Sequence, residues 1–131
     1  MSQENVELSL LAIEAFNRRD LDAFLALMDD GVRADSRLVA IEGGYQGHDG
    51  IRRWWDDLFD IVPDFAVEVV DTRDLGNVTL IAVDIHGRAA GSDVPIDESQ
   101  WQVIEWRETS VTWWAAHKTE AEALEAARLR E

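Results

Sequence analysis

The segment that decides the fold runs from residue 45 to residue 63 and reads YQGHDGIRRWWDDLFDIVP. Its apolar residues recur at intervals of three and four, the period of a helix, with charged residues between them: Ile51, Trp54, Trp55, Leu58 and Phe59. Pro63 ends the pattern because proline lacks the N–H that a helix interior needs. The segment therefore predicts a strongly amphipathic helix, which follows a flexible glycine-rich loop over residues 43–47.

Two further helices and a strand are predicted before this segment. Residues 4–16 show the helical period through Val6, Leu10, Ile13 and Phe16. Asp20 is placed to cap a second, short helix, which would end at residues 29–31. Residues 32–41 then change to a rough alternation of apolar and polar side chains, which favours a strand.

The residues after Pro63 alternate in the way that strands do. Strands are predicted at 65–70, 78–85, 94–106 and 111–116, with a turn at 74–77 and a bend at 88–93. Thr119 and Glu122 form a capping box for a final helix. Helices followed by strands indicate an α+β fold, in which one curved antiparallel sheet has its helices packed on a single face and a cavity is left between the two layers.

Composition restricts the classes of partner. The chain has 131 residues with 47% hydrophobic residues and neither repeats nor linkers, so we expect one domain over residues 1–131. Its formal net charge of −15 repels phosphate backbones and anionic lipids, which argues against nucleic acid and membrane partners. Cysteine is absent, so thiolate chemistry is excluded. The acidic start of the chain is unlike a signal peptide, and we expect a cytoplasmic protein.

Three stretches of the chain carry a family resemblance. They are AFNRRDLDA at 15–23, MDDGV at 28–32 and YQGHDGIRRW at 45–54. Together they resemble the nuclear-transport-factor-2-like superfamily and, within it, the SnoaL-like group, over about residues 4–129. The resemblance implies a cone-shaped fold whose curved antiparallel sheet wraps around the N-terminal helices. It also implies an internal pocket and a homodimer through the outer face of the sheet.

The enzymes of this superfamily supply candidate roles, and most of their residues do not match this chain. Resemblance to ketosteroid isomerase places a general base at Asp35, but its two oxyanion donors are replaced by about Ala12 and Gln102. Gln102 can still donate through its amide. The carboxylates of limonene epoxide hydrolase are missing as well. Polyketide cyclases need an acid and a base in a pocket, and Asp35 with His86 is the one pair that we propose.

Both members of this pair have a structural alternative. An isolated carboxylate at position 35 in an apolar cavity would have a raised pKa and could take a proton next to a carbonyl. Arg33 and Arg37, roughly 7 Å along the strand on the same side, would instead make Asp35 part of a salt-bridged surface ladder. His86 shares its parity with Asp84 and Arg88, so these three residues face either the pocket, where His86 would shuttle protons, or the outside.

Aromatic residues are the expected lining of the pocket. We expect a small apolar or aromatic ligand among Phe24, Tyr45, Trp54, Gln102 and Trp114. By strand parity Trp106 and Trp114 fall on the concave face with Gln102, while Trp101 and Trp113 fall on the other face as a candidate dimer contact. The three histidines have no metal-binding spacing, so neither a metal nor a cofactor is expected.

Two functions follow from these observations. The first is a SnoaL-like pocket protein that performs cofactor-free acid–base chemistry of the isomerase, cyclase or lyase type, with Asp35 as general base. The second is a ligand-binding or dimerisation module without catalysis, which the missing oxyanion donors and hydrolase carboxylates favour.

Overall fold

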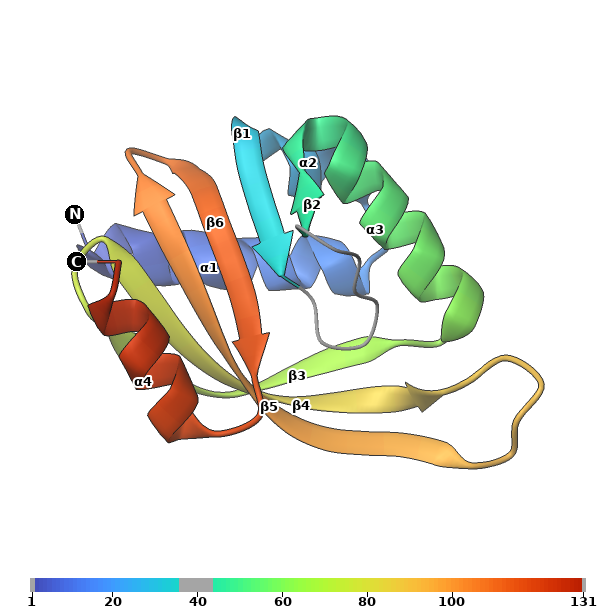
Figure 1. The fold of residues 1–131 in the computed structure, drawn as a ribbon. Helices are drawn as coiled ribbons and strands as arrows, with labels where there is room; N and C mark the ends of the chain where they lie inside the picture. The colour runs from blue at the N-terminus through green and yellow to red at the C-terminus, as the bar shows by residue number, and fades with distance from the viewer. Residues whose placement is uncertain (1, 36–43, 131) are drawn as a thin grey trace.

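The computed structural model of the chain describes residues 2–35 and 44–130 (Figure 1). The helices are α1 (Ser2–Asn17), α2 (Leu21–Ala26), α3 (Gly47–Ile61) and α4 (Glu120–Arg128). The strands are β1 (Met28–Asp35), β2 (Tyr45–Gln46), β3 (Ala66–Asp74), β4 (Val78–Arg88), β5 (Pro95–Arg107) and β6 (Ser110–His117). The α+β class is therefore confirmed. The second half of the strand predicted at 32–41 lies outside the described residues.

The six strands form one curved sheet in the order β2-β1-β6-β5-β4-β3. All neighbouring strands are antiparallel except β1 and β6, which run parallel, so the prediction of a wholly antiparallel sheet needs correction. A parallel pair requires a long crossover connection, and here α3 and four other strands lie between β1 and β6 in the chain. The two-residue strand β2 falls in a stretch that the sequence predicts as loop.

The helices cover both faces of the sheet, not a single face as predicted. The inner core joins α1, α2 and α3 to one face, whereas α4 packs on the other face against β4, β5 and β6 (Figure 1). Successive residues of β6 show the division, since Trp114 belongs to the inner core and Ala115 to the core under α4. A strand that is apolar on both faces needs a cover on both, which is the physical reason for the second layer.

Local sequence signals account for the helix starts. The side chain of Asp20 accepts a hydrogen bond from the Ala23 N–H at 3.1 Å, and Thr119 accepts one from the Glu122 N–H at 3.2 Å, which confirms both predicted caps.

Register shifts interrupt β3 near Val70 and β5 near Trp106. Such bulges bend a strand and increase its twist, so they help the sheet to curve around the helices. None of the described helices combines the length and the apolar character needed to cross a bilayer.

A buried chain of hydroxyl groups ties α1 to the sheet. The Trp106 Nε1–H donates to the Thr79 Oγ1 at 2.8 Å, and that hydroxyl lies 3.1 Å from the Ser9 Oγ. Ser9 donates its own proton to the Asn5 carbonyl at 2.8 Å, so the Thr79 hydroxyl is the donor to Ser9. Thr79 thus satisfies two buried groups at once and holds the Trp106 indole in one orientation.

Replacing Thr79 with valine should destabilise the protein by about 1–3 kcal/mol, because the Trp106 N–H and the Ser9 oxygen lose their partner inside the core. The free energy of unfolding from urea titration measures the effect. Thr72→Val is the matched control, since Thr72 is half-buried and its hydroxyl makes no hydrogen bond with the described residues; we expect a change within about 0.5 kcal/mol. Equal losses in the two variants would contradict the prediction.

Candidate functional site

A cavity lies between the concave face of the sheet and helices α1, α2 and α3. It holds about 80 Å³ of space for water-sized molecules. Its walls come from every layer on that side of the protein, and the described residues that line it are Ala12, Ile13, Phe16, Phe24, Met28, Trp54, Leu58, Phe65, Val67, Gln100, Gln102, Ile104, Trp106, Val111, Trp114 and Ala116. The hollow therefore lies between the sheet and the helices and is partly open to solvent.

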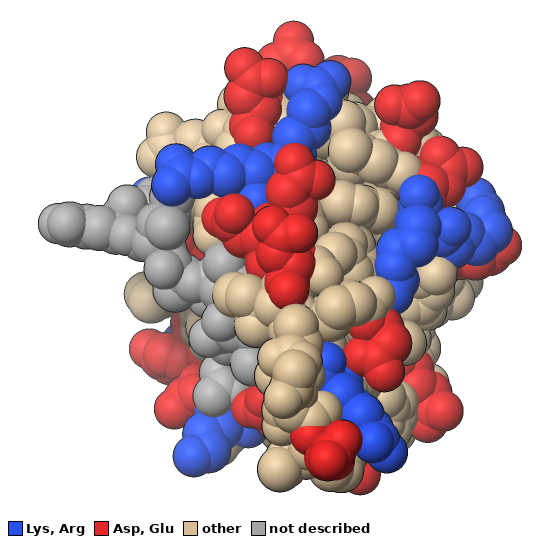
Figure 2. All heavy atoms as spheres, turned by 90° about the vertical axis from the view of Figure 1, so that its right-hand side faces the viewer, with Lys and Arg blue, Asp and Glu red and all other residues tan. Residues whose placement is uncertain are grey.

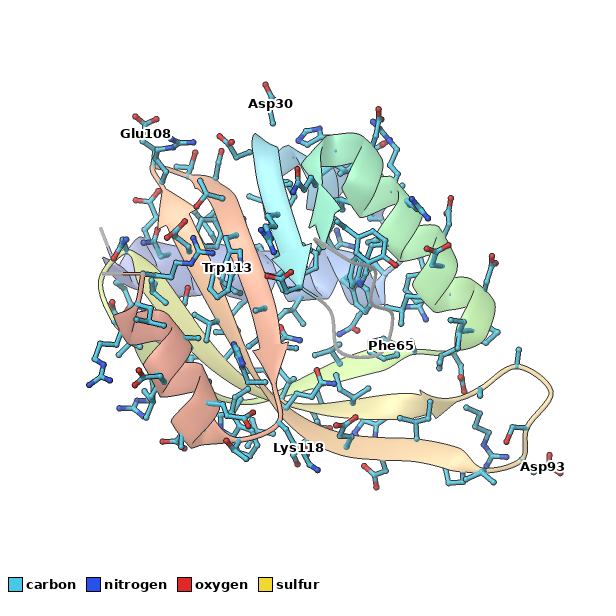
Figure 3. The ribbon with its side chains drawn as sticks, viewed as in Figure 1. Asp30, Phe65, Asp93, Glu108, Trp113 and Lys118 are labelled. Carbon is cyan, nitrogen blue, oxygen red and sulfur yellow. The ribbon has the colours of Figure 1, made fainter. Side chains whose placement is uncertain are left out.

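Aromatic rings form much of the cavity wall. Trp54 of α3 packs edge-on against Trp114 of β6, with ring centroids 4.9 Å apart, and lies nearly parallel to Phe24 at 6.0 Å. Phe16 of α1 contacts Trp54 at 5.7 Å and Phe65 edge-on at the same distance; Phe65 is labelled in Figure 3 just before β3. Tilted and edge-to-face contacts of this kind are favourable, and they hold large flat surfaces toward the cavity.

Three polar groups interrupt this apolar wall. Gln100 is 4% exposed, and Gln102, two residues further along β5, is half-buried. Neither glutamine side chain hydrogen-bonds to any described residue. The Trp54 Nε1–H is also buried without a hydrogen-bond partner among those residues. None of the described lining residues is titratable, so the cavity wall is polar at these points but uncharged.

Four of the predicted ligand-binding residues line this cavity: Phe24, Trp54, Gln102 and Trp114. Trp106 also lines it, as strand parity predicts. Gln100 did not emerge from the sequence as a candidate. The signal was available, because residues two apart in a strand share a face and Gln100 therefore shares the face of Gln102.

Asp35 lies on the other face of the sheet, and its predicted place on the cavity wall is wrong. The neighbouring Ala34 is fully buried in the inner core, so Asp35 points toward the side that α4 occupies. There its carboxylate accepts a hydrogen bond from the Trp113 Nε1–H at 3.0 Å and lies 3.5 Å from the Arg33 guanidinium. Asp35 is therefore part of a surface salt bridge, which is the structural alternative that the sequence analysis gave to a catalytic role. Arg37, the other predicted partner, lies outside the described residues.

His86 also faces outward, away from the cavity, which is the second of the two orientations that the sequence analysis left open for it. Its ring Nδ1 is 3.4 Å from the Asp97 carboxylate, and 49% of its side chain is exposed. Asp84 accepts a hydrogen bond from the Ser99 hydroxyl on the same face, and Arg88 is exposed. The sheet separates β1 from β4 by two other strands, or about 14 Å, so Asp35 and His86 do not form a pair.

Tyr45 is buried but does not line the cavity, which corrects its prediction as a ligand contact. It is 1% exposed and lies on the edge strand β2, where its hydroxyl donates to the Asp57 carboxylate of α3 at 3.2 Å. Burial, followed by the hydrogen bond and the negative charge of Asp57, raises the pKa of the Tyr45 hydroxyl. Tyr45 thus anchors the edge of the sheet to α3.

Trp113 is not an exposed dimer contact. The labelled side chain in Figure 3 projects from β6 and is 6% exposed, packed with Ala123 and Ala127 of α4. The Arg130 guanidinium lies 4.0 Å from the centre of its ring. Trp101 is half-buried next to the same core.

Among the described residues there is no cluster of three His, Asp or Glu side chains that could hold a metal ion.

The fold and the site together define a class of protein. It is an α+β cone in which a curved sheet closes over three helices, with an aromatic cavity between the sheet and the helices. The model of the SnoaL-like domain matches residues 11–120, and the chain belongs to that family. No curated protein matches the chain. The predicted family and fold are thereby confirmed.

Solved structures share the fold at low sequence identity. A nuclear-transport-factor-2-like protein of unknown function from Burkholderia pseudomallei has a TM-score of 0.79 and 17% identity, over 92% of this chain and 95% of that one. A Catenulispora acidiphila protein of ketosteroid-isomerase-like fold, in complex with trimethylamine, has a TM-score of 0.77 and 13% identity, over 93% of this chain and 92% of that one. A putative polyketide cyclase from Sinorhizobium meliloti has a TM-score of 0.72 and 16% identity, over 89% of this chain and 99% of that one.

The environment of Tyr45 predicts a spectroscopic result, because it is the one tyrosine of the chain. Tyrosinate absorbance at 295 nm should rise with a midpoint above pH 10 in the folded protein and near pH 10 in urea. Since the folded pKa is the higher one, the associated stability is present below pH 10 and is lost as the pH rises through the folded pKa. A folded midpoint at or below 10 would show that the hydroxyl is not sealed against Asp57.

Proposed function

We propose that the protein binds a small apolar or aromatic organic molecule in the cavity between the sheet and helices α1 to α3. The observation that carries the proposal is the wall itself, which combines packed aromatic rings with a few convergent polar groups. Ligand sites in proteins typically have this composition. A ring that enters the cavity would meet the faces and edges of Phe24, Trp54 and Trp114.

The size of the cavity limits the ligand. One water needs roughly 10–15 Å³ of this kind of volume. The 80 Å³ available thus corresponds to roughly five to eight water-sized groups. A single aromatic ring with a short substituent fits that space, and a larger ligand would have to project through an opening.

The relatives support a small-molecule role at the level of the fold. The Catenulispora acidiphila structure is a complex with trimethylamine, and the Sinorhizobium meliloti protein is a putative polyketide cyclase. We extend from these only the general expectation that the cavity of this chain receives a small molecule. The identities of 13% and 16% are too low to transfer a substrate.

Binding without acid–base catalysis is the function that the cavity chemistry favours. General acid–base catalysis needs a titratable group within hydrogen-bond reach of the substrate. No described lining residue is titratable, and Asp35 and His86 face away. Isomerase, cyclase or lyase chemistry through Asp35 stays a prediction from the family resemblance, without support from the placement of that carboxylate.

The surface charge supports an absence of nucleic acid and membrane partners. Figure 2 shows acidic side chains at many places on one face, with basic side chains between them. Over the whole chain 27 Asp and Glu stand against 12 Lys and Arg. A surface with this excess repels polyanions, and the proposal of a small-molecule partner in the cytoplasm agrees with it.

Filling the cavity should weaken binding. Ala116→Leu adds three carbons to the wall beside Gln102 and should weaken the binding of a small probe, α-methylstyrene, by tenfold or more, since the probe and the new side chain compete for the same space. Titration followed by the indole N–H resonances of 15N-labelled protein measures the affinity. Binding of the probe by Ala116→Leu with unchanged affinity would place the ligand elsewhere.

Two control variants complete this experiment. Ala121→Leu makes the same change at an exposed position of α4, outside the cavity, and should leave probe affinity unchanged. Asp35→Asn should also leave it unchanged, because Asp35 does not line the cavity. A loss of binding in Asp35→Asn would restore this carboxylate to the ligand site.

We also propose the homodimer that the family resemblance implies, through the part of the outer sheet face that α4 leaves uncovered. That part includes Ala82, Asp84, Ser99 and Trp101. Light scattering should give twice the monomer mass of 14.8 kDa, and Trp101→Glu should shift the protein toward monomer by placing a charge in the contact. A monomer mass at 100 μM wild-type protein would overturn this proposal.

A further inference from the structure

Gln100 occupies an unusual position for an amide. It lies in the middle of β5, opposite Val83 of β4, and the residue is 4% exposed, on the concave face. A carboxamide carries two N–H donors and a carbonyl acceptor. None of them finds a partner among the described residues, and Gln100 lines the cavity, so its amide is available to a molecule bound there. Methionine would fill nearly the same space without the amide.

The geometry points to Gln100 as the residue that selects the ligand. We propose that the cavity takes an uncharged aromatic molecule whose polar edge offers both a hydrogen-bond donor and an acceptor, of the aryl carboxamide type. The proposal rests on the proposed function, because it names the ligand class for the same cavity. A carboxamide ligand would pair with Gln100 through two hydrogen bonds, donating to its Oε1 and accepting from its Nε2.

Gln102 extends this polar strip toward solvent. The two side chains share the concave face and are separated by about 7 Å along the strand. Gln102 is half-exposed, so water can satisfy its amide when the cavity is empty. Gln100 is the more deeply buried of the two, so discrimination between ligands should depend on Gln100 more than on Gln102.

Charged ligands of the same shape are disfavoured for two physical reasons. A charge moved into the apolar cavity loses its hydration, and no described lining residue carries an opposite charge to replace it. The net charge of −15 additionally repels anions. The same net charge attracts cations toward the protein and aromatic faces favour them, so a cation provides the strictest test of the proposal.

Four probes of one shape and different polarity provide the test: benzamide, benzoate, benzamidinium and α-methylstyrene. Wild-type protein and Gln100→Met are titrated with each at pH 7, and the indole N–H resonances report binding. We expect benzamide to bind the wild type and the two ions to bind at least tenfold more weakly. In Gln100→Met the affinity for benzamide relative to α-methylstyrene should fall about tenfold, the equivalent of one good hydrogen bond.

The matched control is Gln46→Met, an exposed glutamine of β2 that lies outside the cavity, in which the benzamide preference should stay as in the wild type. Melting temperature provides a second readout without a ligand. Because Gln100→Met replaces an amide that makes no hydrogen bond with the described residues, it should melt at the same temperature as the wild type or higher. A clear destabilisation would mean that the protein itself satisfies Gln100, and would overturn the proposal.

The remaining outcomes separate this inference from the proposed function. If α-methylstyrene binds in the cavity but benzamide gains nothing from Gln100, the ligand class is wrong and the binding function stands. If benzamidinium binds more tightly than benzamide, the cavity selects cations and the inference is again wrong. If none of the four probes binds, the proposed function fails together with the inference.

Discussion

The packing of Trp54 against Phe24 and Trp114 is the interaction on which the site depends. These three rings come from α3, α2 and β6, so their contacts join two of the three inner helices to the sheet. Rings packed at fixed angles cannot collapse into each other as flexible aliphatic chains can. A hollow beside them persists because each ring is already held by its neighbours, and Trp106 is held in addition by its hydrogen bond to Thr79.

Sequence periodicity was sufficient for the elements and for much of the cavity wall. The apolar period of residues 51–59 predicts α3, and the caps at Asp20 and Thr119 are observed as predicted. Strand parity separated Trp106 and Trp114 from Trp101 and Trp113 correctly. It could not place α4, because β5 and β6 are apolar on both faces and parity alone does not tell which helix covers which face.

The placement of Asp35 shows where family analogy and local pattern disagree. Val32 and Ala34 are apolar and Arg33 and Asp35 are charged, so the alternation of β1 already directs the carboxylate away from the core. Analogy with an isomerase directed it into the pocket instead. The local pattern is right because an ion pair beside solvent costs little, whereas a lone carboxylate in the cavity would lose its hydration.

The sheet consequently divides the chemistry of the protein between its two faces. Asp35, Asp84 and His86 lie on the outer face, where solvent and nearby partners support their charges. The cavity wall on the inner face carries amides and an indole N–H, and none of its described lining residues is charged. Electrostatic fields are weakly screened in an apolar interior, so a single charge there would dominate which ligands enter. Without such a charge, the shape of the cavity and hydrogen bonds to its wall determine which ligands bind. The few polar atoms of the wall then have the role in selecting the ligand that a catalytic carboxylate would otherwise have.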